Sequence, residues 1–187
     1  QVVLDENNAD VHHTLDLSGR ELTADTANIS LSFNGEGTLM YQVIGTRYEP
    51  WNTPPQQVGS LGLDVTYDRS GAQVGDMIRV IANVSSRLDE GAMDQVIVSV
   101  AMAPGMVALV DDLNALVDSG AVQRFERSDR RVTFYLMALQ PREQRSLRFG
   151  MQATRPVNAQ HPPSTAYSYY NPDDNATTGS SSVVVAP

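Results

Sequence analysis

The sequence predicts an all-β fold, an antiparallel β-sandwich crossed by a single α-helix. Most of the 187 residues fall into short runs in which apolar and polar side chains alternate, as they do in strands with one buried face. Turn residues separate these runs at the close spacing typical of sandwiches rather than of βαβ units. Only one segment, 107–119, has its apolar residues at helical spacing.

Residues 1–52 are expected to form a first, smaller β unit. Its strand-like runs are 1–4, 11–17, 28–33 and 38–48. The segment 34–37, Asn-Gly-Glu-Gly, is a strong hairpin signal between the last two runs. Strict alternation places Ile29, Leu31 and Phe33 on one face, which we expect to be buried. So thin a sheet needs a partner layer, which we expect to lie outside this chain.

A proline-rich polar stretch separates this unit from the second one. Pro50, Pro54 and Pro55 cannot serve inside a sheet ladder, so we expect a linker at 53–60 and a second domain at 61–187. The strands predicted in the second domain are 61–67, 77–84, 95–102, 122–127, 132–139, 146–153, 165–170 and 182–185.

The predicted helix has an apolar stripe and an acidic opposite face. Gly120 stands where a helix commonly ends. Burial of the stripe is worth far more than the few tenths of a kcal/mol that acidic residues gain near a helix N-terminus, so the stripe should face inward. The stripe consists of Leu109, Val110, Leu113, Leu116 and Val117. The surface left for a partner comprises Asp111, Asp112, Asn114 and Asp118, of which the last three should point most clearly to solvent.

Composition excludes several classes of function. A net charge of -9 and a pI near 4.6 disfavour nucleic acids and anionic membranes as partners. All 13 basic residues are arginine and there is no cysteine, which removes lysine and thiol chemistry, thiolate metal sites and disulfides. No apolar run approaches the roughly 20 residues that span a bilayer, so no membrane insertion is expected. The start at Gln1, inside a strand-like run, suggests a piece of a longer protein.

No motif points to catalysis, a cofactor or a metal site. His12 and His13 are neighbours on a predicted strand and so point to opposite faces, while His161 lies in a proline-rich segment and is interpreted as a surface residue. The pairs 89–90 and 173–174 are interpreted as solvated loop carboxylates. We therefore predict that the chain is not an enzyme. The opposite hypothesis requires His161 or His13 within hydrogen-bonding reach of a carboxylate in a cleft.

Two further features concern the surface. Three tripeptides fit the N-glycosylation pattern, but those at Asn28 and Asn83 lie in predicted strands, which leaves Asn175 as the acceptor expected in a glycosylating host. Tyr167 and Tyr169 share one face of a predicted strand. Core packing is the favoured interpretation for them, and a binding patch is the alternative.

The second block resembles the C-terminal receptor-binding domain of the alpha-2-macroglobulin family over about 61–185. The resemblance is carried by Pro104-Gly105-Met106, the helix 110–119, the strand 131–136 and the string 167–173, Tyr-Ser-Tyr-Tyr-Asn-Pro-Asp. Ser168 departs from the acidic residue usual in that string. The stretch 35–43, Gly-Glu-Gly-Thr-Leu-Met-Tyr-Gln-Val, is similar to the second half of the family's CUB-like domain.

The resemblance implies a non-catalytic structural and interaction module of a broad-spectrum protease inhibitor, with the bait region and thioester chemistry in upstream domains. The implied partners are other domains of the parent protein, target proteases through that parent, and a receptor or cell-envelope protein. The implied location is extracellular, periplasmic or at the cell surface.

Val110 and Asn114 stand where vertebrate members carry two receptor-binding lysines, so the resemblance does not extend to that receptor contact. The absence of these lysines and of the vertebrate cysteines indicates a bacterial or divergent relative. The alternative function is a β-sandwich adhesion or carbohydrate-binding module, which predicts exposed Tyr167, Tyr169 and Trp51.

Overall fold

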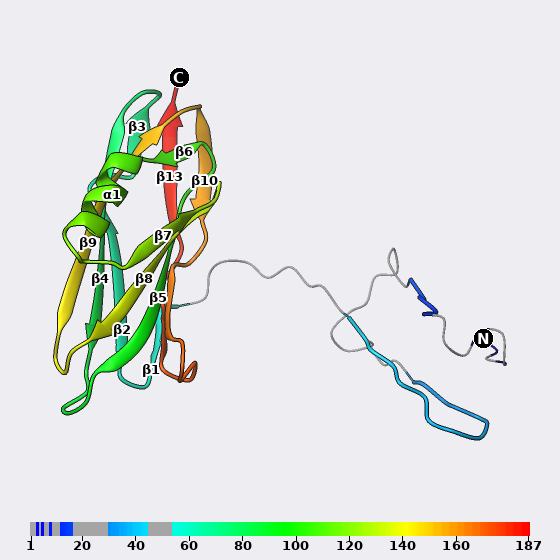
Figure 1. Cartoon of the computed structure of the whole chain (residues 1–187). Helices are drawn as coiled ribbons and strands as arrows, with labels where there is room; N and C mark the ends of the chain where they lie inside the picture. The colour runs from blue at the N-terminus through cyan, green and yellow to red at the C-terminus, as the bar shows by residue number, and fades with distance from the viewer. Residues whose placement is uncertain (1–2, 4, 6–7, 9–11, 17–29, 45–53) are drawn as a thin grey trace. The chain divides into compact units, whose positions relative to one another are not determined.

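The computed structural model describes residues 3, 5, 8, 12–16, 30–44 and 54–187 (Figure 1). The chain divides into two compact units, Gln1–Thr46 and Arg47–Pro187. Every strand and the helix assigned among the described residues lie in the second unit. No helix in this described part is both long and apolar enough to cross a membrane.

Three sheets make up the second unit. The six-stranded sheet has the order β1 (Gln56–Val58), β12 (Asn175–Thr177), β11 (Thr165–Ser168), β5 (Met93–Ala101), β8 (Arg131–Leu139) and β7 (Arg124–Arg127). The four-stranded sheet has the order β2 (Leu61–Tyr67), β4 (Met77–Ser86), β9 (Gln144–Ala153) and β6 (Met106–Ala108). The three-stranded sheet has the order β10 (Val157–His161), β13 (Ser181–Ala186) and β3 (Gly71–Gln73). Paired strands run antiparallel except β13 and β3, which run parallel.

The core lies between the six-stranded and four-stranded sheets. On β5 the alternate side chains of Val96, Val98 and Val100 are fully buried, while Ile97 and Ser99 between them are only half-buried. Phe134 of β8 meets Phe149 of β9 across the two layers, with ring centroids 5.5 Å apart. The period-two pattern therefore produces a sandwich, as the sequence predicts.

The predicted strands agree with the structure, but five further short strands were not predicted. All eight predicted strands of the second domain are confirmed, as β2, β4, β5, β7, β8, β9, β11 and β13. The missed strands, β1, β3, β6, β10 and β12, have three to five residues each, and such short runs give only a weak periodic signal. β1 lies inside the stretch expected to be a linker and begins directly after Pro55.

The helix α1 (Val110–Asp118) crosses the sandwich near β9 and β6 (Figure 1). It begins later than the apolar spacing predicts, because 106–108 forms β6 instead. Its end agrees with the prediction, since Gly120 adopts the positive φ of 72° that glycine tolerates best. Leu113 is fully buried and Leu116 and Val117 are half-buried, so the stripe does face inward.

In the first unit, the described residues 12–16 and 30–44 carry no assigned strand, although a bend at 35–37 marks the predicted hairpin turn. Leu31 and Phe33 are exposed, so the prediction of a buried face is wrong for them. No layer among the described residues covers them, and one apolar face alone does not make a stable sheet. The rest of the predicted runs 1–4, 11–17, 28–33 and 38–48, with Ile29, falls largely outside the described residues.

Candidate interaction surfaces

The start of α1 is fastened to β9 through one glycine. The Leu109 backbone N–H donates to the Gly150 carbonyl at 2.9 Å, and the Gly150 N–H donates to the Asp112 carboxylate at 2.7 Å. Just beyond, β6 pairs with residues 151–153 of β9. The first turn of the helix thus continues the hydrogen bonding of β6 along β9, with a carboxylate in place of a backbone carbonyl.

Position 150 is crowded, so a larger residue there would require the Leu109 and Asp112 side chains to move. A Cβ there would stand 2.8 Å from Leu109 Cδ1 and 3.1 Å from Asp112 Oδ2. This close approach corrects the prediction for Asp112, which is half-buried against β9 instead of pointing outward. The prediction for Val110 is also wrong, because this residue points outward. It was assigned to the inward stripe but is 41% exposed.

The outer face of α1 is acidic and free of ion pairs. Asp111, Asn114 and Asp118 are exposed, as the spacing predicts, and none of them forms a salt bridge among the described residues. The last turn of the helix has no basic residue. The face therefore exposes two carboxylates and an amide to solvent.

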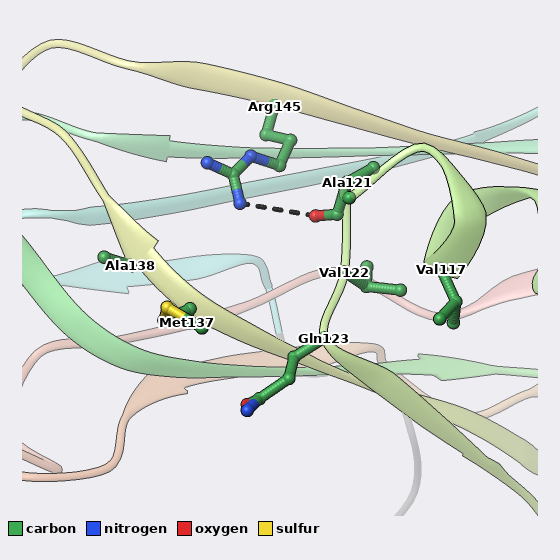
Figure 2. A pocket seen from close by; sticks show the side chains of 8 residues that line it. Val117, Ala121, Val122, Gln123, Met137, Ala138 and Arg145 are labelled. Atoms are coloured by element: carbon green, nitrogen blue, oxygen red, sulfur yellow. Dashed lines mark hydrogen bonds between the residues drawn. The ribbon is translucent and has the colours of Figure 1, made fainter.

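A shallow pocket of about 460 Å³ lies beyond the C-terminal end of α1 (Figure 2). Val117, Val122 and Met137 give it a mainly apolar lining. Arg145 turns its guanidinium toward the Ala121 carbonyl, to which it donates at 3.3 Å.

The charge of Arg145 in this pocket is already paired. Its Nε donates to Glu143 Oε1 at 2.8 Å. Partial burial alone would raise the pKa of Glu143, but the Gln140 N–H and Arg145 hold it below its ordinary value. The pocket thus contains a satisfied ion pair and no nucleophile.

An aromatic row crosses the outer face of the six-stranded sheet. Tyr167 on β11 pairs with Ile97 on β5, Ile97 pairs with Tyr135 on β8, and Tyr135 pairs with Arg124 on β7. The Arg124 guanidinium carbon lies 3.5 Å from the Tyr135 ring centroid. Arg124 also pairs with Glu126, and hydrogen bonds from Arg124 and then Tyr135 lower the pKa of that carboxyl.

Tyr169 and Tyr170 extend the aromatic surface at one end of this face. They are 57% and 73% exposed, and their rings meet edge to face with centroids 5.2 Å apart. Core packing was the favoured interpretation for Tyr167 and Tyr169, and their exposure makes it wrong. Trp51, the third residue of that test, lies outside the described residues.

The turn after these tyrosines is built by side chains interpreted from sequence as loop residues. The Asp174 carboxylate accepts from the Ser60 N–H at 2.7 Å and from Asn171 Nδ2 at 2.9 Å, so it is not a solvated charge. Asn175 Nδ2, the atom that would carry a glycan, donates to the Pro172 carbonyl at 3.0 Å. Asn175 also belongs to β12, so its interpretation as the loop acceptor is not supported.

His161 is buried, not at the surface. Its side chain is packed against Tyr67, with ring centroids 4.5 Å apart, and hydrogen bonds to Ser181 and to the Pro162 carbonyl. Burial lowers the pKa of His161, against the opposing effect of the Pro162 carbonyl. Burial likewise raises the pKa of Tyr67 to about 12, and its hydroxyl donates to the Ala101 carbonyl at 3.1 Å.

The groups that an enzyme would need are not brought together in the described part of the chain. There, His161 has a serine and a carbonyl as hydrogen-bond partners and no carboxylate. His12 and His13 are exposed, and His13 Nε2 lies 3.4 Å from the Asn8 carbonyl oxygen. No group of three or more His, Asp or Glu side chains among the described residues is placed to hold a metal ion.

Residues 92–181, from β5 to the start of β13, match the family model of the A-macroglobulin receptor binding domain. The folded domain is an A-macroglobulin receptor binding domain. No curated protein sequence matches the chain.

Solved bacterial alpha-2-macroglobulins share the fold of this receptor-binding domain. The native Escherichia coli protein, from domain MG7 to the C-terminus, matches with a TM-score of 0.62 and 17% identity, over 74% of this chain and 25% of that one. The trypsin-activated Escherichia coli protein matches with a TM-score of 0.60 and 16% identity, over 72% of this chain and 11% of that one. The methylamine-reacted Salmonella protein matches with a TM-score of 0.60 and 16% identity, over 72% of this chain and 10% of that one. The chain thus aligns with a tenth to a quarter of these proteins' lengths.

The string 167–173, by which the family resemblance is recognised, has identifiable structural roles in the receptor-binding domain. Tyr167 lies on the outer face of β11, the backbone of Tyr169 is held by the Gln95 carbonyl at 2.8 Å, and Asn171 helps Asp174 to close the turn. Sequence reasoning identified this string but missed Gly150 and Asp174, because their partners are remote in the chain. A glycine within a strand was the one local signal available for Gly150.

Proposed function

We propose that this chain is the C-terminal structural and interaction module of an alpha-2-macroglobulin-like broad-spectrum protease inhibitor. The observation that carries the proposal is the family match of residues 92–181 on a domain whose fold is that of bacterial alpha-2-macroglobulins. In this proposal, other domains of the parent protein present the bait region, trap the protease and hold any thioester. The chain itself has no catalytic role and takes no cofactor or metal.

The proposal extends to the organisation of the chain. Residues 1–52 are assigned to the second half of a CUB-like domain, 53–60 to a linker and 61–187 to the receptor-binding-type domain. Exposed Leu31 and Phe33 support the first assignment, because a half-domain leaves its apolar side chains for strands from elsewhere in the parent to cover. The proposed location is extracellular, periplasmic or at the cell surface.

The outer face of α1 is the proposed partner-facing surface. Asp111, Asn114 and Asp118 supply the contacts, while Asp112 holds the helix in place through Gly150. The proposed partner is another domain of the parent, a receptor or a cell-envelope protein. A net charge of -9 makes a nucleic acid an unfavourable partner.

The parent protein provides the test. Its sequence should contain further macroglobulin-like domains, and trypsin should cleave it once in a bait region and change its mobility on a native gel. The cleaved parent should then hold trypsin in a form that hydrolyses a small chromogenic substrate but not casein. A parent without macroglobulin-like domains, or one that leaves casein hydrolysis unchanged, would show the proposal to be wrong.

The helix face is tested by a charge-removing variant in the same parent. The combination Asp111→Asn, Asn114→Ala and Asp118→Asn should weaken the contact made by this face, whether with a parent domain or a co-purified envelope protein, without lowering the domain's stability. The matched control is Asp64→Asn with Glu90→Gln, which removes two exposed carboxylates away from α1. Equal effects of the two variants would exclude a specific role for the helix face.

Exposure of the tyrosines favours a second candidate function. Tyr167 and Tyr169 are accessible, as a carbohydrate-binding or adhesion module requires. Titration of the chain with soluble cello-, xylo- and chito-oligosaccharides, followed by tyrosine fluorescence, tests it. Saturable binding that Tyr169→Ala and Tyr170→Ala abolish would support the second candidate, and a flat titration would exclude it for those glycans.

A further inference from the structure

A second pocket lies at the other end of β6, away from the apolar pocket of Figure 2. It has a volume of about 420 Å³ and lies between the loop that leads into β6, the β7–β8 turn and the end of β9. Its floor includes the buried side chains of Met102 and Met106. Three arginines line it, namely Arg127, Arg130 and Arg155, together with the single carboxylate of Asp129.

Two of these arginines are held in place. Arg127 Nη1 donates to the Ala108 carbonyl at 3.2 Å, which fixes one side of its guanidinium group. The stem of Arg155 lies against Gly105, where a Cβ would stand 2.6 Å from Arg155 Cγ. Gly105 has a φ of +79°, so glycine is required there on both counts. The two guanidinium groups are therefore partly pre-organised.

None of the three guanidinium groups is neutralised by an ion pair within the described residues. The arginines that form salt bridges in that part of the chain are Arg69, Arg124, Arg142 and Arg145. Asp129, although it lines the pocket, is in none of them. Three positive charges and one negative charge leave a local excess of two positive charges, in a chain whose net charge is -9.

We propose that this arginine pocket binds carboxylate side chains of an acidic peptide segment. Guanidinium groups recognise carboxylates through paired N–H donors in a fixed plane, which suits arginine better than any other cation in proteins. The Ser128 and Thr154 side chains already donate to backbone carbonyls, so the arginines carry the recognition. A long polyanion such as a nucleic acid would extend beyond the pocket and be repelled by a chain whose net charge is -9, whereas a short acidic segment could be confined to the pocket.

The test uses the 187-residue chain and a fluorescein-labelled hexaglutamate peptide, with binding followed by fluorescence anisotropy at low salt. The double variant Arg130→Gln/Arg155→Gln should weaken binding at least tenfold. The matched control Arg79→Gln/Arg148→Gln removes two other exposed arginines with no salt bridge among the described residues and the same total charge. It should weaken binding less than twofold. Thermal melts confirm that both variants fold.

Three outcomes would overturn the proposal. They are no saturable binding of hexaglutamate up to millimolar concentration, an equal loss of affinity in both double variants, and tighter binding of a single-stranded DNA oligonucleotide than of hexaglutamate. The last outcome would assign the pocket to phosphate. None of these outcomes bears on the family match, so the proposed function would stand or fall separately.

Discussion

Two segments with the same alternating pattern have opposite fates in this molecule. In β5, Val96, Val98 and Val100 alternate with less buried residues and are completely buried. In 30–33, Leu31 and Phe33 alternate with serines in the same way, yet about half of each side chain is exposed. The comparison shows that alternation defines an apolar face, while a second layer decides whether that face is buried.

The largest expected effect comes from one phenylalanine in each region. Phe134→Ala should lower the free energy of unfolding by about 3–5 kcal/mol, because it removes a fully buried ring from between the sheets. Phe33→Ala should change it by less than about 0.5 kcal/mol, because that ring is exposed. Urea denaturation followed by circular dichroism measures both. A comparable loss for Phe33→Ala would mean that 31–33 is covered in solution.

The next effect concerns the helix that covers β9. Asp112→Ala should cost about 1–3 kcal/mol, because the Gly150 N–H loses its acceptor in a partly buried place. Asp118→Ala, on the exposed face of the same helix, is the control and should stay within about 0.5 kcal/mol. Equal unfolding midpoints for the two variants would show that the hydrogen bond from the Gly150 N–H to Asp112 does not stabilise the domain.

A smaller, pH-dependent effect is expected from His161, the buried last residue of β10 in the three-stranded sheet. Burial keeps its pKa below the ordinary value of 6.5, so the unfolded chain takes up a proton first as the pH falls. The contribution of His161 to the free energy of unfolding should therefore be constant above pH 6.5. Below pH 6.5 it should decrease, by at most about 1.4 kcal/mol per pH unit.

Unfolding midpoints measured from pH 7.5 to 5 check this, because carboxyl groups titrate mainly below that range. His161→Gln should flatten the decline, whereas exposed His12→Gln should preserve it. A decline that survives His161→Gln would place its origin in another group.

The smallest effect is expected on the uncovered outer face of the six-stranded sheet. Arg124→Gln removes the cation that stacks on Tyr135 at an exposed site, and should lower the unfolding midpoint only slightly, by less than Asp112→Ala does. Arg148→Gln, on an exposed position without such a ring, should cost less. A double-mutant cycle with Tyr135→Leu measures the interaction between Arg124 and Tyr135 alone. A coupling energy of zero would show that this interaction does not stabilise the domain.

Much of the fold follows from sequence because its information is local. The long strands and the end of α1 at Gly120 can be predicted from periodicity and from one residue type. The start of α1 could not, because 106–108 is recruited as β6 by pairing with β9, some 45 residues away.

The candidate surfaces divide in the same way. Exposure of Asp111, Asn114 and Asp118 follows from helical spacing, whereas the inward turn of Asp112 depends on Gly150, which is remote in the chain. Burial of His161 likewise depends on Tyr67, which no local pattern connects to it.

The bonds between Leu109, Gly150 and Asp112 have a consequence for recognition. Because they lock the first turn of α1 to the strand ladder, the helix can neither slide nor roll when something docks on it. Its carboxylates are displayed as a rigid epitope, and association forfeits little backbone entropy. We therefore expect substitutions at residue 150 to weaken binding of the proposed partner to this helix, although residue 150 would not itself contact that partner.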